Sequence, residues 1–153
     1  MDIIEGDHST PRGRFALIAA RFNDFIVERL VGSACDTLTR HGVAAADVDL
    51  IRVPGAFEIP QAADRAAVSG RYVAIIGLGC VIRGATPHFE FVADAAASGL
   101  ARVAQVRGIP VVFGVLTTDD VDQALERCGG EVGDKGADAA LAALEMVNLW
   151  TRL

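Results

Sequence analysis

The sequence predicts an α/β fold: a three-layer αβα sandwich with helices on both faces of a parallel sheet of four main strands. Short apolar runs without polar alternation, typical of strands buried on both faces, recur along the chain. Between them lie segments with apolar residues at helical spacing, each long enough for a right-handed crossover. With 153 residues, 52% of them apolar, we expect one domain over residues 1–153 and a full core.

The first half of the chain supplies two strand–helix units. Residues 15–20 form the first convincing apolar strand, and a helix follows to about Arg40, with Asn23 as the candidate N-cap. Gly42 is placed to end this helix in the left-handed conformation. Residues 48–53 give a second strand, which Pro54 stops.

A second helix, rich in small residues, is expected over residues 57–68. Pro60 fits only in its first turn, and Gly70 closes it. The third strand, residues 72–78, runs into a glycine-bearing loop. Thr86 is then expected as the N-cap of a helix that reaches about Arg107.

The last part of the chain begins with Gly108, which ends the third helix, and a fourth strand over residues 111–116. Two helices follow near residues 119–128 and 137–149, joined by a glycine-rich connection. At the other end of the chain, Ile3 and Ile4 form an apolar pair too short to make a strand without a partner.

Residues 77–90 carry the strongest chemical signal. Thr86-Pro87 opens the third helix, because proline at the first helical position loses no hydrogen bond that the helix needs. His88 then lies in the first turn, beside unpaired backbone N–H groups that attract anions, phosphate above all. The positive helix end disfavours imidazolium, whereas a bound phosphate favours it. This stretch equally fits an ordinary helix opening with a surface histidine.

Parallel sheets bind ligands outside the carboxyl ends of their strands. Here those ends are residues 21–23, 54–58, 80–88 and 116–119, which bring an aromatic ring, a carboxylate and a histidine to one edge. We therefore expect the pocket at this edge.

Several classes of function are disfavoured. The formal net charge of −6 argues against nucleic acid as a bulk electrostatic partner, and no segment approaches 18 continuous apolar residues. The acidic segment 1–7 does not resemble a signal peptide. His88-Phe89-Glu90 matches half of a zinc deaminase signature, but the Pro-Cys-x-x-Cys half is absent, so no metal site is expected.

Cysteine usage points to a reducing compartment, the cytoplasm. The three cysteines are widely spaced and form neither a disulfide framework nor a Cys-x-x-Cys pair. Cys35 and Cys128 are interpreted as small core residues. Cys80 could act as a nucleophile with His88, although a small strand residue is the commoner explanation.

Taken singly, several further residues have structural explanations. Phe22 and Phe113 could be core residues, and Glu58 suits a helix start. Arg127 suits the last turn of a helix, and Lys135 could simply solvate a turn.

Several motifs of the sequence, taken together, resemble the 6,7-dimethyl-8-ribityllumazine synthases, enzymes of riboflavin biosynthesis. The motifs are Arg-Phe-Asn-Asp-Phe (21–25), Val-Pro-Gly-Ala-Phe-Glu-Ile-Pro (53–60), the stretch 79–89, Gly-Val-Leu-Thr-Thr (114–118) and Gly-Asp-Lys-Gly (133–136). They follow the family's order and spacing over nearly the whole chain.

The resemblance implies a flavodoxin-like fold and a condensation without a cofactor. The amine of 5-amino-6-(D-ribitylamino)uracil attacks the ketone of 3,4-dihydroxy-2-butanone 4-phosphate. An imine forms, phosphate leaves, and ring closure with loss of water gives the lumazine.

The resemblance also assigns roles to individual residues. His88 would transfer protons, Ala85 and Thr86 would receive the phosphate, and Arg127 would clamp it. The residues implied for the pyrimidine and its ribityl chain are Phe22, Ala56, Phe57, Glu58, Cys80, Val81, Ile82, Phe113 and Lys135.

The family's sites lie between neighbouring subunits of a pentamer, and some members close into a 60-subunit shell. The resemblance therefore implies a homo-oligomer in which Phe113, Arg127 and Lys135 reach the adjacent chain's site. Ile3 and Ile4 would pair with the neighbour's sheet. A flavin- or lumazine-binding paralogue without turnover, or a shell whose main role is enclosure, are the alternatives.

Overall fold

A four-stranded parallel sheet lies at the centre of the structure, a computed structural model that describes residues 1–153. Its strands are β1 (Arg14–Ala20), β2 (Val48–Val53), β3 (Tyr72–Ile82) and β4 (Val111–Thr118). They lie side by side in the order β2-β1-β3-β4, and every neighbouring pair is parallel. This arrangement confirms the predicted fold class.

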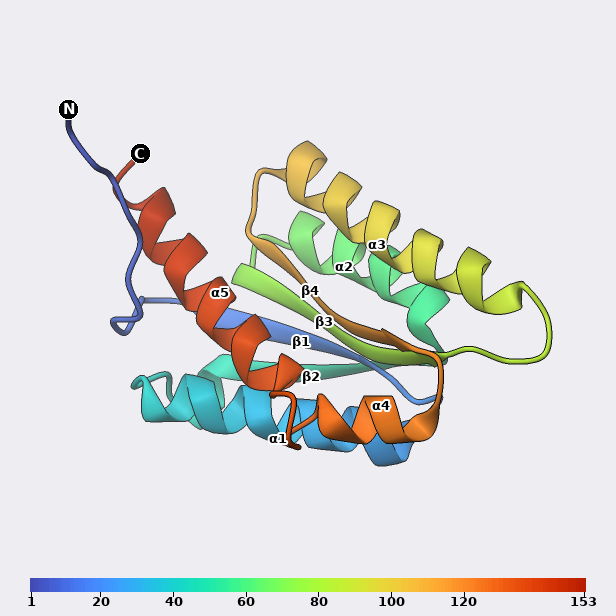
Figure 1. Ribbon diagram of the computed structural model, residues 1–153. Helices are drawn as coiled ribbons and strands as arrows, with labels where there is room; N and C mark the ends of the chain where they lie inside the picture. The colour runs from blue at the N-terminus through green and yellow to red at the C-terminus, as the bar shows by residue number, and fades with distance from the viewer.

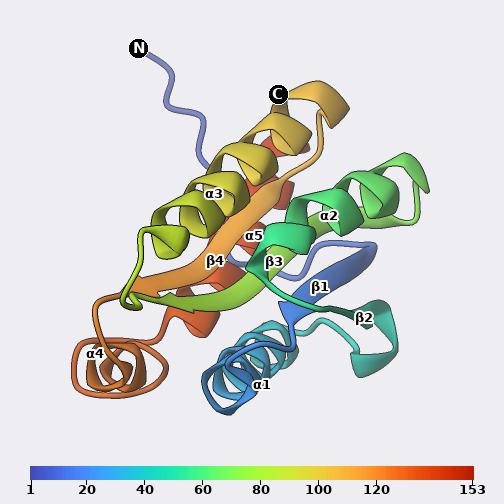
Figure 2. The ribbon, with the colours of Figure 1, turned by 90° about the vertical axis from the view of Figure 1, so that its right-hand side faces the viewer.

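Helices cover both faces of the sheet (Figures 1 and 2). One face is covered by α1 and α5, with the short α4 beside them, and the other face is covered by α2 and α3. The helices are α1 (Asp24–Arg40), α2 (Ile59–Val68), α3 (His88–Arg107), α4 (Val121–Glu126) and α5 (Lys135–Trp150), with 3₁₀ turns at Ala45–Asp47 and Ala56–Glu58. None of these helices combines the length and the apolarity needed to cross a bilayer.

The core has two halves, one on each side of the sheet, and β1 contributes to both. Phe15, Leu17 and Ala19 pack toward α1 and α5. The alternate residues Ala16 and Ile18 pack toward α2 and α3. Successive side chains of a strand point to opposite faces, so a strand covered on both faces shows no polar alternation.

The third and fourth strands are longer than predicted. The sequence indicated a loop from Gly79 onward, but β3 continues to Ile82 and β4 continues to Thr118. The two strands hold each other in the ladder from Gly79 opposite Val115 to Ile82 opposite Thr118. A Cβ on Gly79 would lie 3.1 Å from the Ile59 side chain in the first turn of α2, so this close packing favours glycine within the strand.

The starts of α3, α4 and α5 differ from the predictions. Pro87 occupies the N-cap position of α3 and His88 is the first helical residue, so Thr86 lies one residue outside and does not cap. α4 is shorter than expected, and Asp120 caps it by accepting from the Gln123 N–H. α5 begins two residues early, because the Asp134 carboxylate accepts from the N–H groups of its first turn.

The remaining helix boundaries follow the sequence closely. Pro60 lies in the first turn of α2, after a 3₁₀ turn rather than within one continuous helix from Phe57. Gly42, Gly70 and Gly108 follow their helices with φ of 92°, 68° and 63°, the left-handed conformation that glycine adopts without steric cost.

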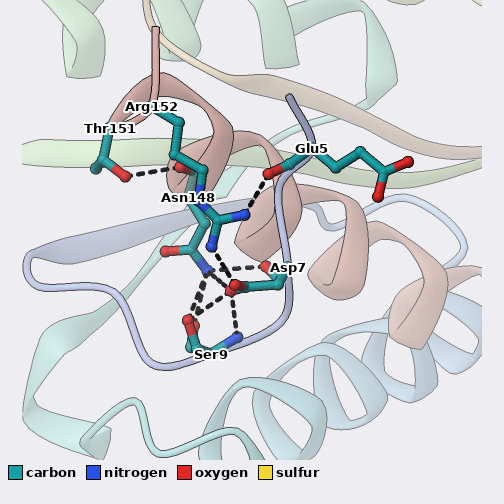
Figure 3. A network of polar contacts seen from close by, with 6 residues as sticks. All are labelled: Glu5, Asp7, Ser9, Asn148, Thr151 and Arg152. Atoms are coloured by element: carbon teal, nitrogen blue, oxygen red, sulfur yellow. Dashed lines mark hydrogen bonds and ion pairs between the residues drawn. The ribbon is translucent and has the colours of Figure 1, made fainter. Parts of the chain in front are cut away.

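The N-terminal segment is tied to the end of α5 (Figure 3). The buried Asn148 amide donates to the carbonyl oxygens of Asp7 and Ser9 at 2.8 and 2.9 Å. Arg152 adds contacts to the Glu5 carbonyl and to the Asp7 carboxylate. Ile3 and Ile4, which precede this network, are exposed and form no strand within the chain. Their pairing with a neighbouring sheet therefore stays a prediction.

Candidate functional site

A hollow of about 660 Å³ opens at the carboxyl edge of the sheet. Three of the four predicted strand-end segments line it, and the fourth, residues 116–119, lies outside. The lining residues are Phe22, Asn23, Pro54, Gly55, Ala56, Phe57, Glu58, Cys80, Val81, Ile82, Gly84, Thr86, His88, Phe89 and Val92.

Two exposed aromatic rings flank the hollow. Phe22 is 73% exposed and Phe57 is 60% exposed, so neither is a core residue. The loop that carries Phe22 is held against the end of β2 by hydrogen bonds from Arg21 N to Val53 O and from Phe22 N to Pro54 O, at 2.8 and 3.1 Å. An exposed ring on a fixed loop is suited to stack on a flat ligand.

Glu58 provides the carboxylate of the site. Its Oε2 accepts a hydrogen bond from the Gly55 N–H at 3.0 Å, which fixes the side chain across the 3₁₀ turn. Oε1 has no hydrogen-bond partner within the chain and is available to accept from a ligand hydroxyl.

The end of β3 presents backbone groups to the hollow. β1 pairs with β3 only as far as Ala19 opposite Leu78, whereas β4 pairs with β3 to its end. The side of Cys80–Ile82 that faces away from β4 therefore lacks a neighbouring strand. Donors and acceptors on such a strand edge can bind the edge of a heterocycle as another strand would.

The Asn23 side chain occupies one acceptor of this strand edge. The prediction that this side chain caps α1 was wrong. Asn23 precedes α1 as predicted, but its side chain does not cap the helix. Asn23 has φ 61° and ψ 43°, and this left-handed conformation directs its Nδ2 to the carbonyl oxygen of Cys80 at 2.8 Å. The hydrogen bond ties the Phe22 loop to the end of β3.

Cys80 is excluded as a nucleophile. The residue is 3% exposed, and burial raises the pKa of its thiol to about 12. The thiol is therefore protonated at neutral pH, and only a thiolate would attack. The structure supports the alternative, a small residue at a strand end.

The start of α3 forms the other end of the hollow. His88 is exposed, and the backbone N–H groups of His88 and Phe89 have no hydrogen-bond partner within the chain. Free N–H groups at the start of a 20-residue helix are suited to bind an anion. Gly84 and Thr86 line the hollow beside them, and Ala85 lies between these two in the same exposed loop.

Phe113, Arg127 and Lys135 do not line the hollow of their own chain. Phe113 lies on the edge strand β4 and is 37% exposed, which contradicts a core role. Arg127 follows α4, with its Nη1 donating to the Gln123 carbonyl at 2.9 Å. Lys135 begins α5, and its N–H donates to the Arg127 carbonyl at 2.9 Å.

Sequence reasoning missed two side chains that line the hollow, Phe89 and Val92. Helical spacing could have indicated Val92, which lies four residues after His88 on α3, but it gives no such signal for Phe89, the residue next to His88. No cluster of three His, Cys, Asp or Glu side chains has a metal-binding arrangement. Cys35, Cys80 and Cys128 are free thiols, the first partly buried and the others buried.

The fold and the hollow define a flavodoxin-like α/β protein with a candidate ligand site at the strand ends, between an exposed aromatic ring and a helix start. Residues 12–151 match the family model described as 6,7-dimethyl-8-ribityllumazine synthase. A protein of that name from Nitratidesulfovibrio vulgaris (strain DSM 19637 / Miyazaki F) is 55% identical over 150 residues, which cover 98% of this chain and 96% of the relative. The chain belongs to the 6,7-dimethyl-8-ribityllumazine synthase family, transferase-class enzymes of riboflavin biosynthesis.

Proposed function

We propose that this chain condenses 5-amino-6-(D-ribitylamino)uracil with 3,4-dihydroxy-2-butanone 4-phosphate. The amine adds to the ketone and loses water to give an imine. Loss of a carbon-bound proton then expels phosphate, and the ribitylamino nitrogen closes the ring with loss of a second water. No step changes the overall oxidation level of the substrates, so the chemistry requires no redox cofactor.

The pyrimidine half of the hollow is formed by Phe22 and by the unpaired edge of Cys80–Ile82. Phe22 would stack on the ring, and the backbone of Cys80, Val81 and Ile82 would bind the ring's polar edge. Ala56, Phe57 and Glu58 form the wall beside it, and the free Oε1 of Glu58 is suited to accept a hydrogen bond from a ribityl hydroxyl.

The phosphate half is the loop before α3 together with the first turn of this helix. Ala85 and Thr86 would receive the phosphate, and the unpaired N–H groups of His88 and Phe89 add the favourable end of the helix dipole. His88 would transfer the protons that imine formation, elimination and ring closure require, work that imidazole performs near neutral pH. Binding both substrates in one hollow lowers the entropy cost of their encounter.

A neighbouring copy completes the site in this proposal. Arg127 and Lys135 are brought together by the Lys135 N–H to Arg127 carbonyl hydrogen bond, on a surface that does not line their own hollow. Phe113 is partly exposed on the edge strand. All three are therefore available to an adjacent subunit, Arg127 as the phosphate clamp and the other two beside the pyrimidine.

The proposed assembly is a homo-oligomer, a pentamer at least, with the exposed Ile3 and Ile4 added to the neighbour's sheet. A light-scattering mass separates a pentamer from a decamer or a 60-subunit shell. The three free thiols favour the reducing cytoplasm as the compartment.

The observation that carries the proposal is the meeting of an unpaired strand edge, an exposed Phe22 and a helix start with His88 in one hollow. The test is absorbance at lumazine wavelengths after the purified protein is mixed with both substrates. Product that accumulates far beyond one equivalent per chain supports catalysis. Product bound at one equivalent, without turnover, would instead identify a lumazine-binding paralogue and overturn the proposal.

A further inference from the structure

Arg83 lies at the point where the chain leaves the sheet to form the loop of the phosphate half. Its backbone N–H donates to the Thr118 carbonyl at 2.8 Å, one residue beyond the last pair of the β3–β4 ladder. The loop that follows, residues 84–87, is exposed, and none of Gly84, Ala85 and Thr86 makes a hydrogen bond within the chain. The position of this loop is therefore set by its two ends.

The Arg83 side chain links the two ends of this loop, the end of β3 and the start of α3, to the end of β4. Its Cζ lies 4.8 Å from the centre of the Phe89 ring, and its Nη1 lies 3.8 Å from Glu90 Oε1, both in the first turn of α3. Its Nε donates to Asp119 Oδ1 at 2.8 Å, at the end of β4. One guanidinium thus links the sheet edge to the helix start across the base of the loop.

The charge of Arg83 does not face the hollow. Ile82 and Gly84, its neighbours in sequence, line the hollow, and so does Phe89, but Arg83 does not. Two carboxylates face its guanidinium, and such an arrangement directs the positive charge away from a bound phosphate.

We propose that Arg83 is a positioning residue for the phosphate site: by holding Phe89 and the start of α3 against Asp119, it sets where Ala85, Thr86 and the free N–H groups meet the phosphate. This inference rests on the proposed function. Planar guanidinium geometry matters here, because Arg83 both stacks on a ring and donates in a fixed direction, and a lysine ammonium does not reproduce this combination.

The test is steady-state kinetics of the assembled protein with each substrate varied in turn. Arg83→Met keeps an unbranched stem of similar shape and removes the guanidinium, with its charge and its directed N–H groups. We expect the KM for the butanone phosphate to rise at least about tenfold, because small displacements of a binding group have large effects. The KM for the pyrimidine should stay within about twofold of the wild type, since the Arg83 side chain pairs with Phe89, Glu90 and Asp119 and not with the residues proposed to bind the pyrimidine.

Arg107→Met is the matched control. Arg107 also lies on α3, and its Nε donates to Asp64 Oδ1 at 2.7 Å, but this pair is at the far end of the helix. The Arg107 variant should retain both wild-type KM values. A general loss of helix packing would instead alter both variants and both substrates alike, and this outcome would overturn the proposal.

Asp119→Asn separates positioning from direct phosphate binding. If Arg83 acts through Asp119, this variant also raises the KM for the phosphate substrate, and combining it with Arg83→Met adds little. If Arg83 instead binds phosphate directly, Asp119→Asn leaves that KM unchanged or lowers it, and Arg83→Lys stays near the wild type; either result overturns the proposal. A wild-type protein that forms no lumazine would refute the proposed function, whereas an active wild type with an unaltered Arg83→Met variant would refute this inference alone.

Discussion

Asn23 offers the sharpest test of how the pyrimidine half is built, because its backbone and its side chain can be altered separately. Its φ of 61° is the one positive value at a residue other than glycine, and its Nδ2 donates to the Cys80 carbonyl at 2.8 Å. Asn23→Gly removes the hydrogen bond and keeps the left-handed backbone accessible. Asn23→Ala removes the hydrogen bond and also places a Cβ in that backbone conformation.

The two contributions have different sizes. Loss of one hydrogen bond costs about 0.5–1.5 kcal/mol of unfolding free energy, a cost shared by both variants. A left-handed alanine adds about 1–2 kcal/mol. We therefore expect Asn23→Gly to lose about 1 kcal/mol and Asn23→Ala about 2–3 kcal/mol. For a chain of this size, the alanine variant should melt about 2–8 °C below the glycine variant.

The assay combines thermal melting, at one fixed protein concentration because the melting temperature of an oligomer depends on it, with kinetics. Both variants free the Cys80 carbonyl and loosen the Phe22 loop, so both should raise the KM for the pyrimidine by a similar factor, about fivefold for about 1 kcal/mol. Equal melting temperatures of the two variants would refute the backbone reasoning. An unchanged KM in both would show that the Asn23–Cys80 contact plays no part in binding.

Three further substitutions and one chemical probe test other parts of the structure. His88→Ala should lower kcat by about 10²–10⁴-fold while the light-scattering mass stays at the wild-type value, and unchanged turnover would remove His88 from the mechanism. Arg127→Ala should raise mainly the KM for the phosphate substrate, by about tenfold or more, and an equal loss for the pyrimidine would contradict a phosphate clamp. Asn148→Ala should lower unfolding free energy by about 1–3 kcal/mol in chemical denaturation, because the hydrogen bonds from its buried amide to the Asp7 and Ser9 carbonyls are lost; a stability equal to the wild type would contradict this. Burial raises the pKa of the Cys80 thiol to about 12, so this thiol gains reactivity only as the pH rises toward that value. Iodoacetamide at about pH 8 should therefore leave turnover unchanged. Rapid inactivation that bound substrate blocks would contradict the burial of Cys80.

The fold class was predictable because its signals are local and repeated. Doubly buried strands such as 15–20 lack polar alternation, and glycines such as Gly42 and Gly108 mark helix ends through a conformation that few other residues adopt. The end of β3 was not predictable in this way. Gly79 suggested a loop, but cross-strand pairing with Val115 keeps it in the sheet, and pairing between strands is not visible in local sequence.

The same difference between local signals and long-range contacts applies to the candidate site. Strand-end position and helix-start chemistry brought Phe22, Glu58 and His88 to one hollow, as the sequence indicated. The contacts that hold the hollow together were not predictable from local sequence, because Asn23 bonds to Cys80 across 57 residues of sequence and Arg83 bonds to Asp119 across 36. Phe113, Arg127 and Lys135 lie outside the hollow of their own chain, so their placement in a site remains a prediction that depends on a neighbouring subunit.

The decisive measurement for the proposed site is a crystal structure of the protein with a phosphate-bearing substrate analogue and the pyrimidine. We expect the phosphate at residues 84–86 and the first N–H groups of α3, His88 within hydrogen-bond reach of the reacting atoms, and the pyrimidine edge on the unpaired side of Cys80–Ile82. Both ligands bound away from the carboxyl edge of the sheet, with His88 facing only solvent, would contradict this expectation.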